Sequence, residues 1–267
     1  MTLKLSVLAS GSSGNIIYIE SDKTSILIDA GLSKKRTNIL LNKINKDLKD
    51  IKAIFVSHEH VDHVRGIGVI NRHHNTLIYG NKDTLSCDKF KKTTGDINPD
   101  SLKYIDPHET IILDDLKITA FSTSHDSINP QSYMIEQDNK KLICLTDTGY
   151  VNDKLLSKIK DANVYLIESN HDVDLLKNGR RPEFNKQRIL SEKGHLSNDD
   201  SGELLANCIN ENTHTIILGH MSKDHNTENI ALGSVKRVLS EKCDYNLDSV
   251  DIIAFIQGNE PSEIFEV

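Results

Sequence analysis

Hydrophobic residues along most of the chain occur in short runs that polar residues, glycine or proline interrupt. Runs of this length that are rich in Ile, Leu and Val are typical of β-strands. We expect strands at 3–9, 15–20, 25–28, 51–56, 76–79, 102–105, 110–113, 116–122, 131–136, 141–145, 163–167 and 215–218.

Helical spacing of apolar residues is clearest at 33–45, where one stripe is made of Ile39, Leu40, Leu41 and Ile44. Segments 64–72 and 82–92 also suit helices, and another helix is expected to run to about 210. This alternation predicts an α/β fold. Because no internal repeat, low-complexity tract or linker divides the sequence, we expect a single domain spanning 1–267.

The composition fits a folded protein that does not enter a membrane. Of the 267 residues, 37% are hydrophobic, which is enough for a sizeable core. No apolar run approaches the roughly 20 residues that cross a bilayer, and the N-terminus lacks a signal-peptide pattern, so we expect a cytoplasmic protein. The formal charge of −7 counts against a generally basic surface but leaves room for a local basic cleft. The sequence gives no indication of oligomeric state.

The four cysteines and three of the histidines do not indicate a functional site. Cys87, Cys144, Cys208 and Cys243 are far apart and form no C-x-x-C pattern, which argues against a zinc ribbon or a disulfide framework. We interpret His171, His214 and His225 as solvated side chains.

Segment 56–63 reads Val-Ser-His-Glu-His-Val-Asp-His and follows an apolar run. In an extended chain, His58 and His60 point to the same side, because strand side chains repeat every second residue. If a helix follows, Asp62 and His63 come round to a second point close by. Neutral imidazoles and carboxylates are the ligands of hydrolytic Zn, Mn and Fe centres, so this segment predicts a site for two metal ions.

Further chelating residues stand where later strands end, and the ends of strands in one sheet converge in space. The expected set has three ligands for each ion and one bridging carboxylate. These are His58, His60 and His125 for one ion, Asp62, His63 and His220 for the other, and Asp147 for the bridge.

Two features near the N-terminus each admit two interpretations. Asp29, at the end of 25–28, is either a turn former or the acceptor of a hydrogen bond from a ligating imidazole. The segment Ser-Gly-Ser-Ser-Gly-Asn at 10–15 is either an ordinary hairpin connection or a loop that holds a phosphate. In the second case Ser12, Ser13 and Asn15 contact the substrate.

His195 precedes a helix start, where Ser197 and Asp200 form the capping-box pattern. A helix N-terminus favours an anion, so His195 and Ser197 could hold a phosphate, or His195 could protonate a leaving oxygen. A plain loop histidine is the alternative. The basic stretch before it, which includes Arg180 and Arg181, is either a solvated helix face or a groove that follows a phosphate backbone.

Asp29, the H-x-H-x-D-H segment, His125, Asp147 and His220 resemble the five successive motifs of the metallo-β-lactamase superfamily. The resemblance implies a four-layer αββα sandwich with a two-metal site at one edge of its sheets. Segments 8–15, 194–197 and 218–222 resemble the YycJ (also called WalJ) group, which is regarded as DNA exonucleases acting 5′ to 3′. His195 and Glu168 resemble positions that tRNA-maturing relatives use beside the metals, His195 as an acid. The chain lacks the inserted cap domain and the long flexible arm of RNA-processing relatives.

These features predict a metal-dependent phosphodiesterase that contacts DNA through its phosphates and acts in DNA repair or replication. Two divalent ions, Zn, Mn or Fe, would serve it, with Asp62 orienting the attacking water. A glyoxalase-type thioester hydrolase or a hydrolase of small phosphodiesters would use the same ligands. A metal-stabilised scaffold that binds nucleic acid without cutting it is the third hypothesis, and seven ligands with a bridging carboxylate argue against it.

Overall fold

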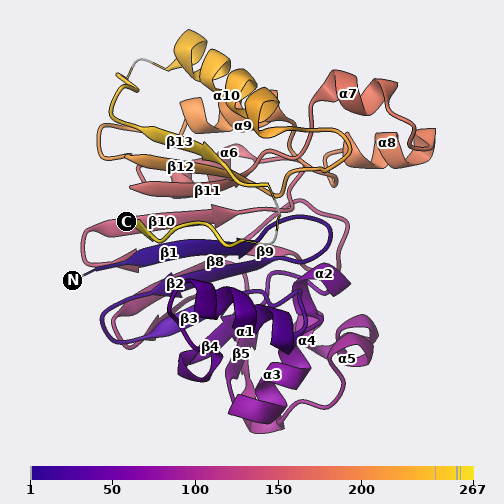
Figure 1. Ribbon diagram of the computed structural model, residues 1–267, viewed down its shortest axis with the longest axis vertical. Coiled ribbons are helices and arrows are strands. Elements are labelled where there is room, and N and C mark those ends of the chain that lie inside the picture. The colour runs from indigo at the N-terminus through magenta and orange to yellow at the C-terminus, as the bar shows by residue number, and fades with distance from the viewer. Residues whose placement is uncertain (1, 244, 257, 259) are drawn as a thin grey trace.

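Two β-sheets pack face to face at the centre of the molecule, and helices cover their outer faces (Figure 1). The computed structural model describes residues 2–243, 245–256, 258 and 260–267, and within these residues each sheet has seven strands. The first sheet contains, in spatial order, β14 (Phe265–Glu266), β1 (Lys4–Ala9), β2 (Ile16–Glu20), β3 (Ser25–Ile28), β4 (Ala53–Phe55), β5 (Leu77–Gly80) and β6 (Leu102–Tyr104).

The second sheet contains, in spatial order, β13 (Asp251–Ala254), β12 (Thr215–Gly219), β11 (Val164–Glu168), β10 (Lys140–Leu145), β9 (Gln131–Gln137), β8 (Leu116–Ser122) and β7 (Thr110–Leu113). Its strands β10 to β13 are parallel, whereas β7 to β10 are joined as antiparallel pairs. In the first sheet β3 to β6 are parallel.

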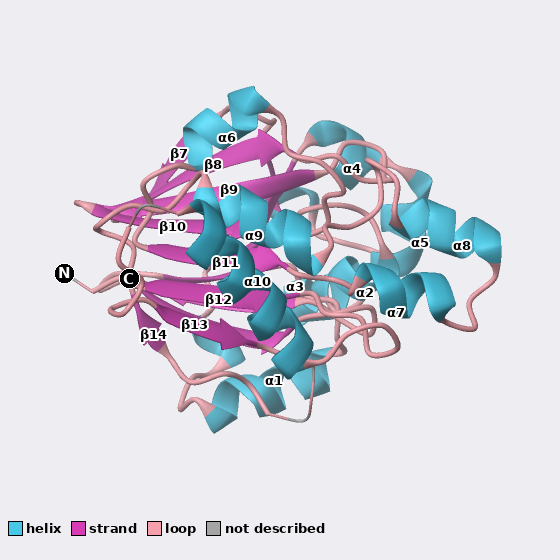
Figure 2. Cartoon of the chain, turned by 90° about the horizontal axis from the view of Figure 1, so that it is seen from above, coloured by secondary structure: helices cyan, strands magenta, loops and turns pink. Residues whose placement is uncertain are grey.

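Each sheet has its own layer of helices. The first is covered by α1 (Lys34–Lys43), α2 (Val61–Val64), α3 (Ile67–His74), α4 (Lys82–Ser86) and α5 (Asp88–Thr94). The second is covered by α6 (Asp153–Ile159), α9 (Asn198–Ala206) and α10 (Glu228–Lys242). Two further helices, α7 (Val173–Asn178) and α8 (Glu183–Ile189), project from the end of the sandwich on the side of α2 and α5 (Figure 2). Single 3₁₀ turns lie at Leu48–Asp50 and Pro99–Ser101.

Because both faces of most strands are buried, the strands are almost continuously apolar rather than alternating. Leu5 and Val7 of β1 point into the layer between the sheets, and Leu8 points into the layer beneath the helices. Between the sheets, Phe55 packs edge-on against Tyr133 with ring centroids 5.5 Å apart. This core holds the two sheets in a fixed relation, and with it the strand ends that carry polar residues.

Strands β3, β4, β8, β10, β11 and β12 all end at the same edge of the sandwich (Figure 2). The residues that follow these ends include the histidines and aspartates singled out above. The two sheets therefore bring segments that are far apart in sequence to one place.

The helices differ most from the expectations. Segment 82–92 forms two helices that break at Cys87, whose backbone is extended and whose Sγ accepts from the Phe90 N–H. In α1, Ile39 of the expected apolar stripe is 37% exposed. Thr37 is buried instead, and its hydroxyl donates to the Ser33 carbonyl at 3.1 Å. Four elements, α6, α10, β13 and β14, were not expected from the sequence. Among the described residues, no helix combines the length and apolarity that crossing a membrane requires.

Candidate metal centre

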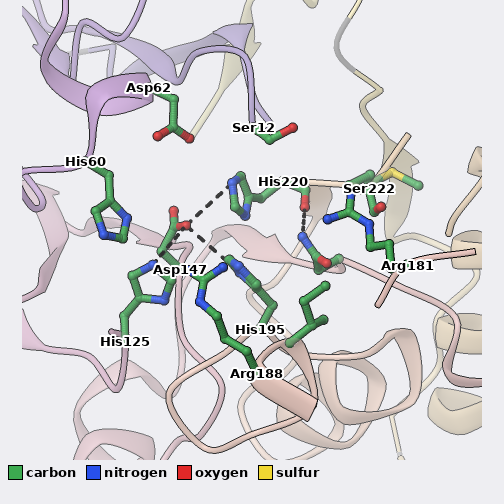
Figure 3. Close-up of a pocket in the computed structure, with 13 residues that line it drawn as sticks. Ser12, His60, Asp62, His125, Asp147, Arg181, Arg188, His195, His220 and Ser222 are labelled. Carbon is green, nitrogen blue, oxygen red and sulfur yellow. Dashed lines mark hydrogen bonds and ion pairs between the residues drawn. The ribbon is translucent and has the colours of Figure 1, made fainter. Parts of the chain in front are cut away.

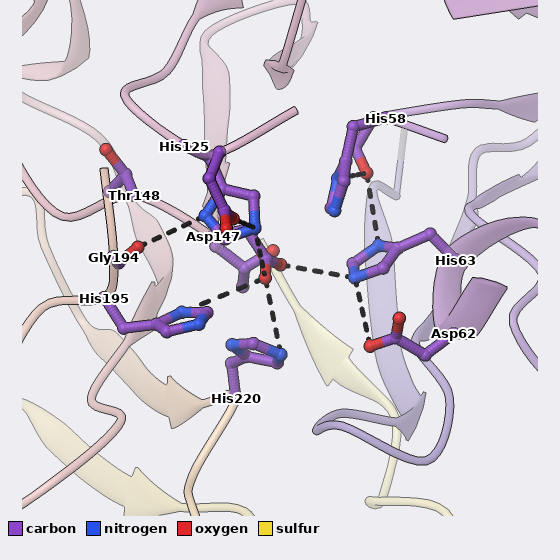
Figure 4. A network of polar contacts seen from close by, with 12 residues as sticks. His58, Asp62, His63, His125, Asp147, Thr148, Gly194, His195 and His220 are labelled. Carbon is purple, nitrogen blue, oxygen red and sulfur yellow. Dashed lines mark hydrogen bonds and ion pairs between the residues drawn. The ribbon is translucent and has the colours of Figure 1, made fainter. Parts of the chain in front are cut away.

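Asp29 orients two of the candidate ligands. It follows β3 with a left-handed backbone (φ 59°), and its carboxylate accepts from Ser57 N at 2.8 Å, Ser57 Oγ at 2.7 Å and His63 Nδ1 at 2.7 Å. Ser57 Oγ in turn accepts from His58 Nδ1 at 2.9 Å. Both imidazoles therefore carry a proton on Nδ1 and turn Nε2 toward the centre (Figure 4). Of the two interpretations of Asp29, the geometry matches the imidazole acceptor; Ser57 was not recognised as the link.

Three histidines form the first group. His58, His60 and His125 have ring nitrogens within 4.8 Å of one another. His58 follows β4, and His125 follows β8, where its Nδ1 donates to the Gly194 carbonyl at 3.2 Å. Burial lowers the pKa of all three imidazoles, that of His58 most clearly. The three rings are therefore neutral near pH 7, which is the form that binds a metal ion.

The second group contains Asp62, His63 and His220, whose ligand atoms also lie within 4.8 Å of one another. His220 follows β12 with a left-handed backbone (φ 50°). Burial alone would lower the pKa of His63 and of His220. The Asp147 carboxylate outweighs it, together with Asp29 for His63 and Glu168 for His220, and raises these pKa values to about 10 and about 9.

Asp147 lies between the two groups. Its Oδ2 is 3.5 Å from His63 Nε2, and its Oδ1 is 3.5 Å from His220 Nε2 and 3.9 Å from His125 Nε2. Burial would raise the pKa of this carboxyl, but the surrounding imidazoles, His220 and His63 first, hold it well below its usual range. The carboxylate is thus charged and lies within reach of both groups: Oδ2 faces His63, and Oδ1 lies between His220 of the second group and His125 of the first.

Glu168, at the end of β11, accepts two hydrogen bonds on one oxygen. Its Oε1 is 2.6 Å from His195 Nδ1 and 2.7 Å from His220 Nδ1, while Oε2 accepts from Thr148 N at 3.0 Å. The side chain is fully buried, which opposes ionisation, but His195 and His220 lower the pKa of its carboxyl to about 2. One carboxylate thereby orients a candidate ligand and a candidate acid together.

The centre contains buried polar atoms that lack a hydrogen-bond partner among the described residues: His58 Nε2, His220 Nε2 and Asp147 Oδ2. Such atoms are rare in folded proteins because an unpaired buried polar group costs free energy. All three point at the space between the two groups, where a cation would pair with them. Imidazole nitrogens with carboxylate oxygens are a donor set for Zn, Mn or Fe, so the residues present fit divalent metal ions.

A cavity of about 240 Å³ opens over this centre. Arg181 and Arg188 also line it: in Figure 3 Arg188 lies beside His125 and His195, and Arg181 lies near Ser222. Arg188 pairs with Asp126, the neighbour of His125, and Arg181 pairs with Asp224 at 2.8 Å. The cavity is lined by Ser12, His60, Asp62, His125, Asp147, Asn170, Arg181, Arg188, Ile189, His195, His220, Met221 and Ser222.

Some residues proposed for substrate contact lie elsewhere. Ser12 and Arg181 line the cavity, whereas Ser13 and Arg180 are absent from its lining. Asn15 is buried, and its amide bonds Gly11 and lies 2.9 Å from His63 Nε2, so it holds the loop against the metal centre. Ser197 is buried as the N-cap of α9, with its hydroxyl committed to Asp200.

The interpretation of His171 and His225 as solvated was wrong. Their exposed fractions are 1% and 4%. His171 is covered because its backbone pairs with Ser197 at the start of α9. His225 packs against Gly179 at the end of α7, a helix that the sequence had not marked. His214 is exposed, as expected.

The sequence matches the family model described as "Beta-lactamase superfamily domain" over residues 24–221. Among curated proteins, it is 41% identical over 228 residues to the exodeoxyribonuclease WalJ of Streptococcus pneumoniae, with 85% of each chain covered. It is 40% identical over 242 residues to the exodeoxyribonuclease YycJ of Bacillus anthracis, with 91% of each covered.

Among solved structures, the metallo-β-lactamase fold protein YhfI from Bacillus subtilis superposes with a TM-score of 0.74 at 17% identity, with each chain covered in full. Human tRNase Z, short form, gives a TM-score of 0.61 at 16% identity, with 82% of this chain and 93% of that chain covered. These two likenesses concern the fold alone. The family model covers most of the chain, and the two curated relatives are 41% and 40% identical in sequence over 85% and 91% of it. This chain therefore belongs to the metallo-β-lactamase superfamily.

Proposed function

We propose that this protein is a metal-dependent exonuclease that degrades DNA from the 5′ end, in the cytoplasm, during DNA repair or replication. The observation that carries the proposal is that two ligand groups around Asp147 open into a cavity that Arg181 and Arg188 also line. Fixed cations beside hydrolytic ligands suit a phosphodiester, whose oxygens gain charge during attack. The exodeoxyribonuclease names of the two curated relatives favour DNA as the substrate.

His58, His60 and His125 would hold one divalent ion, Asp62, His63 and His220 a second, and Asp147 both. The ions, which we propose to be Zn, Mn or Fe, would acidify a water molecule and offset negative charge on the phosphoryl oxygens. Seven ligands exceed the four of a closed structural zinc site, which supports a catalytic centre.

The chain's own groups then carry the protons. Asp62, which lines the cavity, orients the attacking water and accepts its proton. His195 also lines the cavity, and its Nδ1 proton is held by Glu168, so Nε2 is the nitrogen turned to the substrate. In its charged form His195 donates the Nε2 proton to the 3′ oxygen as the P–O bond breaks. Arg181 and Arg188 bind the phosphate backbone as it enters.

The test is cleavage of matched DNA and RNA, single- and double-stranded, end-labelled and carrying a 5′-phosphate or a 5′-hydroxyl. Reactions with Mn or Zn are compared with EDTA, and Asp62→Asn is the matched variant, with its metal content measured. We expect metal-dependent, stepwise loss from the 5′ end of DNA by the wild type and none by the variant. Intact strands under all conditions, together with turnover of a thioester or of a small phosphodiester, would assign the chain to those hydrolases instead.

A further inference from the structure

The helix α8 carries an exposed aromatic ring close to the entrance of the site. Phe184 is 70% exposed, the largest exposed fraction among the large hydrophobic residues described. Only Ile189 of this helix is buried, so Phe184 does not anchor α8 to the rest of the protein. A single exposed apolar side chain is ordinary in itself. What matters at this position is its neighbour one turn along.

Arg188 lies four residues after Phe184 and therefore on the same face of the helix, with about 5–6 Å between such Cβ atoms. Arg188 lines the cavity, and its guanidinium reaches Asp126, whose other oxygen is 3.3 Å from His125 Nε2. The end of α8 that carries Arg188 thus stands over the metal centre, while its first turn lies in the projecting α7–α8 region (Figure 2). Going outward from the metal centre, this face of α8 presents first the Arg188 guanidinium and then the Phe184 ring.

We propose that Phe184 stacks on a base of single-stranded DNA whose adjoining phosphate is bound by Arg188. This rests on the proposed function and adds a base contact to it. Phosphate contacts fix the register of the strand without reading its sequence. Stacking on an aromatic ring is also tolerant of sequence, because every base has a π-face. In an enzyme that removes successive nucleotides, such a contact would hold each new base after the strand advances, whatever its identity.

The two residues also complement each other in charge and polarity. Arg180, Arg181 and Lys186 lie near Phe184 in sequence together with one acidic residue, Glu183, while in space Arg181 also pairs with Asp224 and Arg188 with Asp126. A nucleic-acid strand would find at this place a ring for its base and guanidinium groups for its phosphates, whereas a protein partner would find only one apolar side chain. The chemistry of the patch therefore favours the strand.

The experiment compares Phe184→Ala with the wild type on 5′-phosphorylated single-stranded DNA in Mn. The substrates carry one abasic residue at each of the first six positions in turn. We expect Phe184→Ala to raise KM about tenfold on the intact strand, with kcat affected much less. At one abasic position the KM of the wild type should rise by the same factor, and the KM of the variant should not rise further. Phe184→Trp should restore the wild-type KM.

The matched control is Tyr245→Ala. Tyr245 is 46% exposed and belongs to the connection between α10 and β13. This connection lies on the other side of the molecule from α8 (Figure 1). Its replacement should leave KM unchanged. Two results would overturn the stacking role. One is an equal KM for Phe184→Ala and the wild type on the intact strand, and the other is a rise in KM on every abasic strand that is as large for the variant as for the wild type.

If the wild type cleaves no DNA, the proposed function fails and the stacking contact is judged by binding alone. Fluorescence anisotropy with a labelled single strand in Ca²⁺ then measures the dissociation constant. Tenfold weaker binding by Phe184→Ala than by the wild type, with no such difference on a strand that is abasic at one position, supports the contact without catalysis. No difference from the wild type rejects it.

Discussion

Replacing Glu168 with Gln removes one charge from the point where two imidazoles are held. Gln keeps the shape of the side chain but offers one oxygen and one NH₂ group. If the oxygen faces His195 and His220, the NH₂ group opposes the Thr148 N–H, which then has no acceptor for its proton. If the amide is turned round, its NH₂ group faces two ring N–H groups. Either arrangement leaves at least one buried donor without an acceptor.

The size of the effect follows from the lowered pKa of Glu168. A fall from 4.5 to about 2 corresponds to about 3 kcal/mol of folding free energy for the charged carboxylate. Because the folded pKa is the lower one, this contribution is present above pH 4.5 and is lost as the pH falls to about 2. The raised pKa of His220 acts in the opposite sense: its contribution is present below pH 6.5 and is lost as the pH rises through about 9. Both contributions are therefore present near pH 6.

Urea unfolding of the metal-free proteins at pH 6 measures this prediction. Glu168→Gln should lower the free energy of unfolding by about 3 kcal/mol, and the gap should close as the pH falls to 2. With its imidazole less firmly oriented, the variant should also bind Mn or Zn about 10- to 100-fold more weakly in competition with a chelator.

The matched control is Glu59→Gln. Glu59 is also buried, but it contacts Lys89 and the Ile128 N–H and bonds none of the candidate ligands. Its replacement should leave metal affinity within about threefold, by this reasoning. If Glu168→Gln matches the control in both metal affinity and stability, the positioning role of Glu168 is refuted.

Three further predictions concern other parts of the site. The raised pKa values of His63 and His220 keep both rings protonated at pH 7, so metal uptake should release protons. Metal affinity should therefore rise with pH up to about 9 to 10. Calorimetry of metal binding in buffers of different ionisation enthalpy measures the proton release, and a binding enthalpy that does not depend on the buffer would contradict it. Ser197→Ala should cost about 1 kcal/mol in urea unfolding through loss of the α9 cap, with metal content unchanged. Gly31→Ala places a Cβ 1.6 Å from the Asp62 carbonyl, so it should lower both stability and metal content; a full metal load at wild-type stability would contradict that.

Much of the metal centre could be predicted because its ligands follow apolar strands. The run that becomes β4 ends just before His58, and the runs that become β10 and β12 end just before Asp147 and His220. In parallel strands the carboxyl ends meet at one edge of the sheet. The positions of the apolar runs, and of the polar residues directly after them, are therefore enough to predict that such residues lie together. The resemblance to metallo-β-lactamases rested on the same positions.

The wall facing the ligands could not be predicted in the same way. Helices α7 and α8 are short and each buries one residue, Leu176 and Ile189, so they lack the repeated apolar face that marks a helix in sequence. Arg188 was visible only as one cation in a basic stretch. Which of those cations would reach the cavity depends on how α8 lies over the site, and that is a property of tertiary packing.

The backbone at the strand ends explains why the ligands point where they do. Asp29, Asp147 and His220 all have positive φ, at 59°, 57° and 50°, although none is a glycine. Asp114 and Asp138 also have positive φ, but they lie in tight hairpin turns, where this conformation is common. At the strand ends no hairpin requires it, and each residue costs of order 1 kcal/mol of backbone strain. A chain that continued as extended strand would alternate these side chains to opposite faces of the sheet; the left-handed residue instead turns each one across the shared edge. At these three positions the strain therefore accompanies the convergence of side chains on one point, which links the backbone conformation to the metal centre rather than to the packing of the sandwich.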